Sequence, residues 1–123
     1  MRSLVIIGLG GFIGALLRYL ISGWVQRLFS NPWFPYGTAG VNILGCLMIG
    51  LLGGWSEHRD LFSPATRLFL FMGILGSFTT FSTFGFETLS LLRDQRMGAA
   101  LGNIALQVIL GLGAVWLGYG LSK

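Results

Sequence analysis

The sequence is poor in charged residues. Only 10% of its 123 residues are charged and only 4 are acidic, whereas soluble globular domains carry about 25% charge. Its hydrophobic share is 54% and its mean hydropathy is +0.77. These values exclude an ordinary soluble domain and predict an all-α membrane protein. Because a crossing takes about 20 residues, the chain has room for four transmembrane helices and short loops.

Residues that hold metals or perform catalysis are also scarce. The single cysteine, Cys46, has no second thiol in the chain to pair with and falls in an apolar run, so we expect a small core residue. The single histidine, His58, lies in the polar segment EHRD, and no His/Cys/Asp cluster has transition-metal spacing. No catalytic triad is visible, so we do not expect an enzyme. The net charge of +4 indicates lipid headgroups and anions as partners rather than nucleic acid.

Glycine, in contrast, is abundant. The chain has 20 glycines, more than twice the usual share of about 7%. Several are spaced one helical turn apart, at Gly10/Gly14, Gly50/Gly54 and Gly98/Gly102. Small residues with this spacing let membrane helices approach closely, so these pairs predict helix contacts.

The apolar runs predict one domain, residues 1–123, of four transmembrane helices. We expect these helices over about 4–26, 37–56, 65–92 and 97–120. The first run is too long for a secretory signal, lacks a small-residue cleavage site and contains Arg18. Ser63 and Pro64 predict the cap and first residue of the third helix, and the polar turn RDQR at 93–96 ends it.

The third helix contains an unusual segment. Residues 73–88 read GILGSFTTFSTFGFET, too rich in hydroxyls to face lipid and too apolar for a loop. This pattern predicts that the helix is broken in mid-membrane, near residues 76–80, and restarts at Thr79 or Thr80. A break frees backbone N–H and C=O groups, which in a membrane must be buried in protein or must bind water or an ion.

Polar residues on the other helices are further candidates. Arg18 shares a face with small and polar residues, and an intramembrane arginine costs about 2.5 kcal/mol or more, so it either serves the function or satisfies nearby carbonyls. Asn42 either holds helices together or lines a polar path. Asn103 and Gln107 lie one turn apart with Gly111 continuing the line, which fits either a polar track or helix contacts.

The basic residues do not favour one orientation in the membrane. With four crossings, Arg2, Arg59, Arg67 and Lys123 face one side and Arg27, Arg93 and Arg96 the other. Four against three gives no bias under the positive-inside rule, so we expect insertion in both orientations. Opposed copies can then form an antiparallel, dual-topology homodimer whose broken helices meet in mid-membrane.

The chain resembles the Fluc (CrcB-type) fluoride channels. The resemblance is carried by GGFIGALLRY at 10–19, PYGTAGVNILGC at 35–46 and above all GSFTTFSTFGFET at 76–88, and it spans all four helices. It implies a multi-pass protein of the inner (plasma) membrane that exports fluoride passively through two pores per antiparallel dimer. It also implies a structural Na⁺ on the dimer axis, bound by the backbone carbonyls of Gly76 and Thr79.

The same resemblance implies Phe81 and Phe84 as pore residues and Asn42, Asn103 and Gln107 as a polar wall. At 100° per residue, Thr80, Phe81, Phe84, Glu87 and Thr88 fall on one wall of the helix. Ring edges are positive and, with amide and hydroxyl donors, can replace part of an anion's hydration shell. In all, we expect the fluoride path to include Arg18, Thr38, Asn42, Thr80, Phe81, Ser82, Phe84, Glu87, Asn103 and Gln107.

Two other classes of protein remain open at this stage. A small multidrug or cation exporter would also be short and unbiased in charge, but proton coupling needs a carboxylate deep in an early helix, where this chain has Arg18. A non-transporting assembly subunit of the membrane would not need a hydroxyl-rich broken helix. Fluoride efflux from liposomes distinguishes all three classes.

Overall fold

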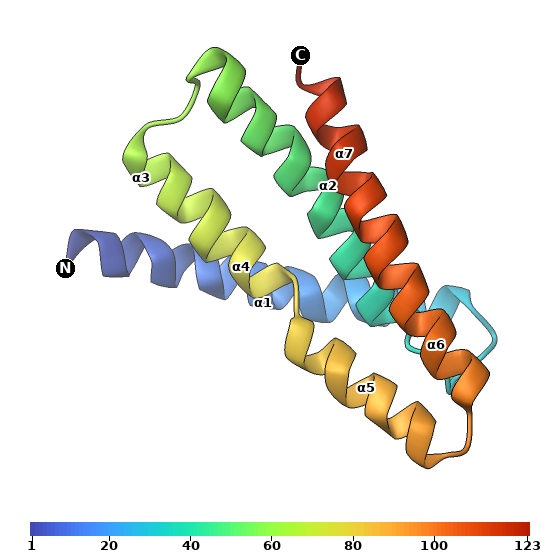
Figure 1. The fold of residues 1–123 in the computed structure, drawn as a ribbon. Helices are drawn as coiled ribbons and strands as arrows, with labels where there is room; N and C mark the ends of the chain where they lie inside the picture. The colour runs from blue at the N-terminus through green and yellow to red at the C-terminus, as the bar shows by residue number, and fades with distance from the viewer.

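The structure, a computed structural model of residues 1–123, consists of helices and short connections (Figure 1). In chain order the elements are α1 (Arg2–Leu28), α2 (Tyr36–Arg59), α3 (Pro64–Arg67), the π-helical segment η1 (Leu68–Leu75), α4 (Gly76–Phe78), α5 (Phe81–Arg93), α6 (Met97–Ala105), the π-helical segment η2 (Leu106–Leu110) and α7 (Gly111–Leu121). They form 4 segments long and apolar enough to cross a membrane: Arg2–Leu28, Tyr36–Arg59, Pro64–Arg93 and Met97–Leu121. The prediction of an all-α, four-span membrane protein is confirmed.

The ends of the helices follow ordinary capping chemistry. The Ser63 hydroxyl accepts a hydrogen bond from the Thr66 amide at 3.2 Å, and Pro64 is the first helical residue, which confirms the predicted cap. After α2 and α5 the chain turns through left-handed residues, Asp60 with φ 47° and Gln95 with φ 60°. These turns keep the connections between spans short.

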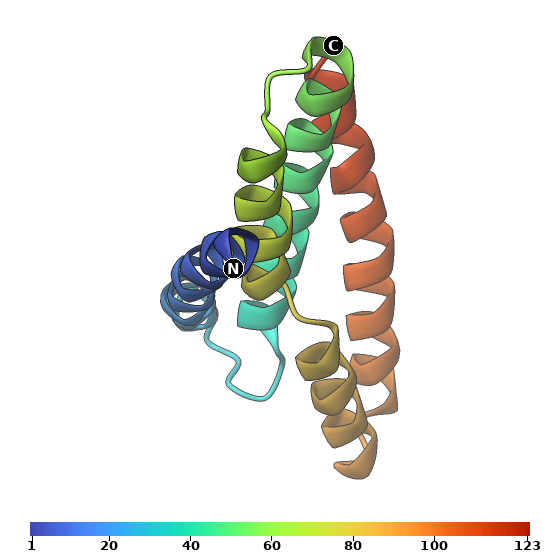
Figure 2. The same ribbon diagram turned by 90° about the vertical axis from the view of Figure 1, so that its left-hand side faces the viewer.

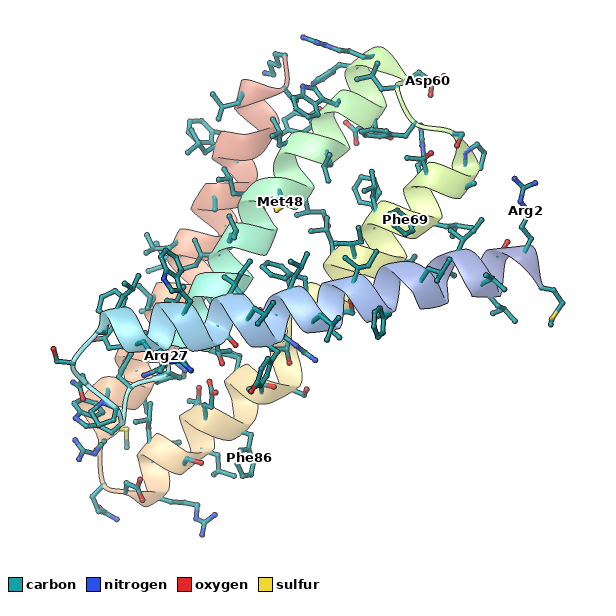
Figure 3. All side chains as sticks on the ribbon, turned by 180° about the vertical axis from the view of Figure 1, so that it is seen from behind. Arg2, Arg27, Met48, Asp60, Phe69 and Phe86 are labelled. Carbon is teal, nitrogen blue, oxygen red and sulfur yellow. The ribbon has the colours of Figure 1, made fainter.

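The spans do not all run in the same direction. α2 lies beside α7 and also contacts η2, whereas α1 crosses the third span at η1 and α4 (Figures 1 and 2). Only 20 of 123 residues are buried. Most large apolar side chains project outwards, as Phe86 on α5 illustrates (Figure 3). Such an outer surface suits contact with lipid or with another copy of the chain.

Glycines make the crossing of α1 and the third span possible. A Cβ on Gly10 would lie 2.6 Å from the Phe69 carbonyl oxygen and 2.9 Å from Gly73 Cα. A Cβ on Gly14, one turn later, would overlap the Ser77 hydroxyl and the Ile74 carbonyl. The predicted contact through Gly10 and Gly14 is therefore confirmed.

The contact between α2 and α7 is built in the same way. A Cβ on Gly50 would overlap the Val115 carbonyl, and one on Gly54 would overlap the Ser122 side chain, so this predicted pair is confirmed too. The third predicted pair makes no such contact within the chain, because no other element lies within 4 Å of where a Cβ on Gly98 or Gly102 would be. These two glycines leave the outer surface of α6 smooth.

The crossing of α1 predicts a sharp difference between neighbouring glycines. We expect Gly10→Ala to destabilise the protein by about 1–3 kcal/mol, since the new methyl group meets backbone atoms that cannot move aside. Gly8→Ala is the matched control, because nothing lies within 4 Å of its added Cβ, and it should stay within about 0.5 kcal/mol of the parent. Thermal unfolding in detergent measures both. Equal stability of the two variants would contradict this packing.

Candidate functional site

The third span leaves the helical conformation at two residues. Thr79 has φ −88° and ψ 159°, and Thr80 has φ −152° and ψ 115°, both extended. Helix α5 begins at Phe81 with Thr80 as its N-cap, whose hydroxyl accepts the Thr83 amide at 3.3 Å. In Figure 2 this short extended connection separates α4 from α5.

The extended residues redirect the hydrogen bonds of the backbone. In a continuous helix the Gly76 carbonyl would accept the Thr80 amide, but that amide donates to Asn42 Oδ1 at 2.8 Å. The Thr79 carbonyl would likewise accept the Thr83 amide, which donates to the Thr80 hydroxyl instead. The carbonyls of Gly76 and Thr79 are therefore both released from their helical partners.

The side chain of Asn42 on α2 forms hydrogen bonds with both backbone polar groups of Thr80. Its Oδ1 accepts the Thr80 amide, and its Nδ2 donates to the Thr80 carbonyl at 3.0 Å. One side-chain amide thus satisfies both polar groups of a residue that has left the helix, which matters because unpaired backbone groups are costly in an apolar environment. Asn42 holds α2 to the third span, as one of its two expected roles required.

A chain of side-chain amides continues from Asn42. Its Nδ2 also donates to Gln107 Oε1 at 2.6 Å, and Gln107 Nε2 donates to Asn103 Oδ1 at 3.0 Å. Asn103 is fully buried and donates to the Thr88 hydroxyl at 3.0 Å. We call Asn42, Gln107 and Asn103 the amide chain. It links α2 through α6 and η2 to α5, so the part of the third span that follows the break is tied to α2.

A cavity of about 360 Å³ lies at the break. The rings of Phe81 and Phe84, with centroids 5.6 Å apart, form part of its wall together with Asn42 and Gln107. The full lining is Asn42, Gly45, Cys46, Ile49, Phe71, Leu75, Gly76, Thr79, Thr80, Phe81, Phe84, Gln107 and Val108. None of these residues is charged. Phe81 is 83% exposed, so the cavity opens onto the surface of the chain.

A second cavity of about 400 Å³ lies on the other side of the break, between α1, α2 and α5. It contains Arg18 and Glu87, which form no ion pair, and the hydroxyl residues Ser22, Thr38, Thr80 and Thr83. Thr38 donates to Glu87 Oε1 at 2.8 Å, while the buried Glu87 Oε2 has no hydrogen-bond partner. Thr80 is the one residue that lines both cavities.

The single predicted wall on α5 is wrong in part. Phe81 and Phe84 face the first cavity, but Glu87 faces the second, and Thr88 is buried and bonded to Asn103. Thr80 lies before the helix starts, so helical geometry does not apply to its side chain. Ser82, another predicted path residue, is exposed and lines neither cavity, although its hydroxyl lies 3.5 Å from that of Thr80.

Two residues have a place at the site that the sequence did not predict. Cys46, expected in the core, is half-buried and lines the first cavity one turn after Asn42, a spacing that could have revealed it. Thr83 lines the second cavity, and its hydroxyl accepts a hydrogen bond from the hydroxyl of Thr80, the N-cap of α5. The T-x-x-T spacing at 80–83, a hydroxyl residue three positions after a candidate cap, was the available signal.

Comparison with known proteins agrees with the sequence motifs. A family model described as "CrcB-like protein, Camphor Resistance (CrcB)" matches residues 5–119. The chain belongs to this CrcB family. The resemblance inferred from the motifs is thereby confirmed, and the matched region includes both cavities and the whole amide chain.

Relatives in this family match nearly the whole chain. It is 46% identical to "Fluoride-specific ion channel FluC 3" of Methanosarcina barkeri and 48% identical to "Fluoride-specific ion channel FluC 1" of Methanosarcina acetivorans, each over 96% of this chain and 88% of the relative. It is 45% identical to "Fluoride-specific ion channel FluC" of Methylobacillus flagellatus over 100% of this chain and 96% of the relative. Because these relatives are ion channels by name, the prediction that this CrcB protein is not an enzyme is confirmed.

The contacts of Asn42 predict a large loss of stability when its amide is removed. Asn42→Leu keeps the volume but breaks three hydrogen bonds, so the Thr80 amide and the Gln107 carbonyl lose their partners. We expect a loss of about 2–4 kcal/mol in the free energy of unfolding in detergent. Ser82→Ala, an exposed polar-to-apolar change two residues beyond Thr80, should change it by less than about 0.5 kcal/mol. Similar losses in both variants would contradict the role given to Asn42.

Proposed function

We propose that this CrcB protein is a fluoride-selective channel that lets fluoride leave the cytoplasm passively across the inner (plasma) membrane. One observation carries the proposal: an aromatic pair, Phe81 and Phe84, faces the side-chain amides of Asn42 and Gln107 in an uncharged cavity at the interruption of a membrane span. The names of the relatives support the same function.

The cavity offers a small anion partial compensation for its lost water. Amide N–H groups donate hydrogen bonds, and aromatic rings present a positive edge, so both can replace hydration. No fixed positive charge lines this cavity, and an ion is therefore not trapped in it. Arg18 in the neighbouring cavity raises the local anion concentration, and Thr80, which lines both cavities, passes the ion between them.

The working unit in this proposal is an antiparallel dimer with two pores. The balanced arginines and lysines support insertion in both orientations, and the labelled Arg2 and Arg27 illustrate this balance at opposite ends of α1 (Figure 3). The exposed Phe81 ring and the open first cavity support the same unit, because a second copy would cover them. In this arrangement the first cavity of each copy is closed by the partner copy, and the two closed cavities form the two pores.

A structural Na⁺ on the dimer axis completes the proposal. The carbonyls of Gly76 and Thr79 have lost their helical partners, and Gly76 is exposed on the surface of the single chain. A two-fold axis would bring four such oxygens together. No three His, Cys, Asp or Glu residues cluster in the chain, so neutral backbone oxygens are the ligands offered, and these suit a monovalent cation better than a divalent one. When bound, Na⁺ would hold the two breaks together.

The aromatic pair predicts a specific loss of transport. Phe81→Ile combined with Phe84→Ile keeps most of the bulk and apolarity but removes the positive ring edges, so initial fluoride efflux from liposomes should fall at least about tenfold. Methionine at the same positions is polarisable and adaptable and should retain part of the flux. Asn42→Asp should be the poorest conductor, since a carboxylate in a narrow path repels an anion. If the folded double isoleucine variant transports fluoride as fast as the parent, the rings of Phe81 and Phe84 serve only for packing, and their proposed role in transport is wrong.

The assembly has a structural test. An experimental structure of the purified protein should contain two antiparallel copies and one density on their axis, coordinated by the Gly76 and Thr79 carbonyls of both copies. Protease protection of tagged termini in membranes should find them on both sides. Termini on a single side would exclude the antiparallel dimer. A well-resolved dimer whose axis carries no ion would exclude the sodium site while leaving the dimer intact.

A further inference from the structure

The amide of Asn42 has no free hydrogen-bond donor. Its Nδ2 carries two hydrogens, of which one goes to the Thr80 carbonyl at 3.0 Å and the other to Gln107 Oε1 at 2.6 Å. Its Oδ1 accepts the Thr80 amide at 2.8 Å. An anion that enters the first cavity can therefore bind the amide of Asn42 only after one of these partners has left.

Of the two acceptors, Gln107 is the one able to leave. If Asn42 released Thr80, a backbone carbonyl in an apolar cavity would stay unpaired. The Gln107 carbonyl belongs to a long, flexible side chain that itself lines the cavity and can turn within it. Gln107 also lies in η2, and π-helical turns of this kind occur frequently at functional sites.

We propose that Gln107 is an internal competitor of the transported anion: its carbonyl oxygen occupies the Asn42 donor until fluoride displaces it. This inference rests on the proposed fluoride path. A hydrogen bond to an ion is about twice as strong as one between neutral groups, so a strongly accepting anion wins the exchange. Chloride, which is larger and a weaker acceptor, displaces the carbonyl less readily, so Gln107 contributes to selectivity.

The proposal predicts a gain on removing Gln107. Gln107→Met keeps the length of the side chain and removes the competing oxygen, so the fluoride concentration that half-saturates initial efflux should fall about fivefold, the equivalent of one neutral hydrogen bond. Chloride efflux should rise relative to fluoride efflux. Gln26→Met is the matched control, because Gln26 also holds backbone groups, at Phe34 and Gly37, but lies outside this cavity. In this control variant the fluoride concentration that half-saturates efflux should be the same as in the parent.

A second measurement follows the side chain itself in the parent protein. The side-chain NH₂ resonances of Gln107 in an NMR spectrum, assigned by their absence from Gln107→Met or Gln107→Glu, should shift on titration with fluoride and not with chloride. Resonances that stay in place while the parent conducts fluoride would overturn the competitor role alone. An unchanged or higher half-saturating concentration in folded Gln107→Met would do the same. A parent that passes no fluoride would overturn the proposed function itself.

Discussion

The two hydrogen bonds between the Asn42 side-chain amide and the Thr80 backbone are the constraint on which the rest of the site depends. We call this pair of bonds the Asn42–Thr80 bracket. A chain that leaves the helix inside a membrane exposes N–H and C=O groups that lipid cannot satisfy. Here the side-chain amide of α2 satisfies both polar groups of Thr80. Because this bracket holds Thr80 extended, the Gly76 carbonyl is released on one side and α5 begins at Phe81 on the other. The freed carbonyl and the aromatic pair are thus two results of one contact.

The packing of the other helices keeps this contact in place. Glycines on α1 and η1 bring their backbones together, which holds the first half of the third span, while α2 packs on α7 through Gly50, Gly54 and Gly118. The amide chain then ties α5 to the same frame through the fully buried Asn103. The two halves of the third span are held by different neighbours, so the break between them can be kept without a continuous helix.

Much of this arrangement follows from the sequence because it depends on local pattern. Apolar run lengths predict the spans, Ser63 and Pro64 predict a helix start, and glycine spacing predicts two of the helix contacts. Hydrogen bonds between residues far apart in the sequence cannot be predicted from local pattern. Spacing places Asn42 on a polar face of α2, but its bonds to residues 38 and 65 positions away depend on how the spans pack. Glu87 was misplaced because it lies about 120° from Phe81 around α5, so the two ends of the predicted wall face different cavities.

The bracket is tested most directly by hydrogen exchange at one amide. The Thr80 amide should exchange slowly in the parent protein, because it donates to Asn42 Oδ1 at 2.8 Å. In Asn42→Leu it should exchange much faster, while the Thr79 amide, which donates to Leu75, keeps its protection for as long as the fold persists. Slow exchange of Thr80 in both proteins would contradict the account, since it would mean that the backbone at the break is paired without the side chain of Asn42.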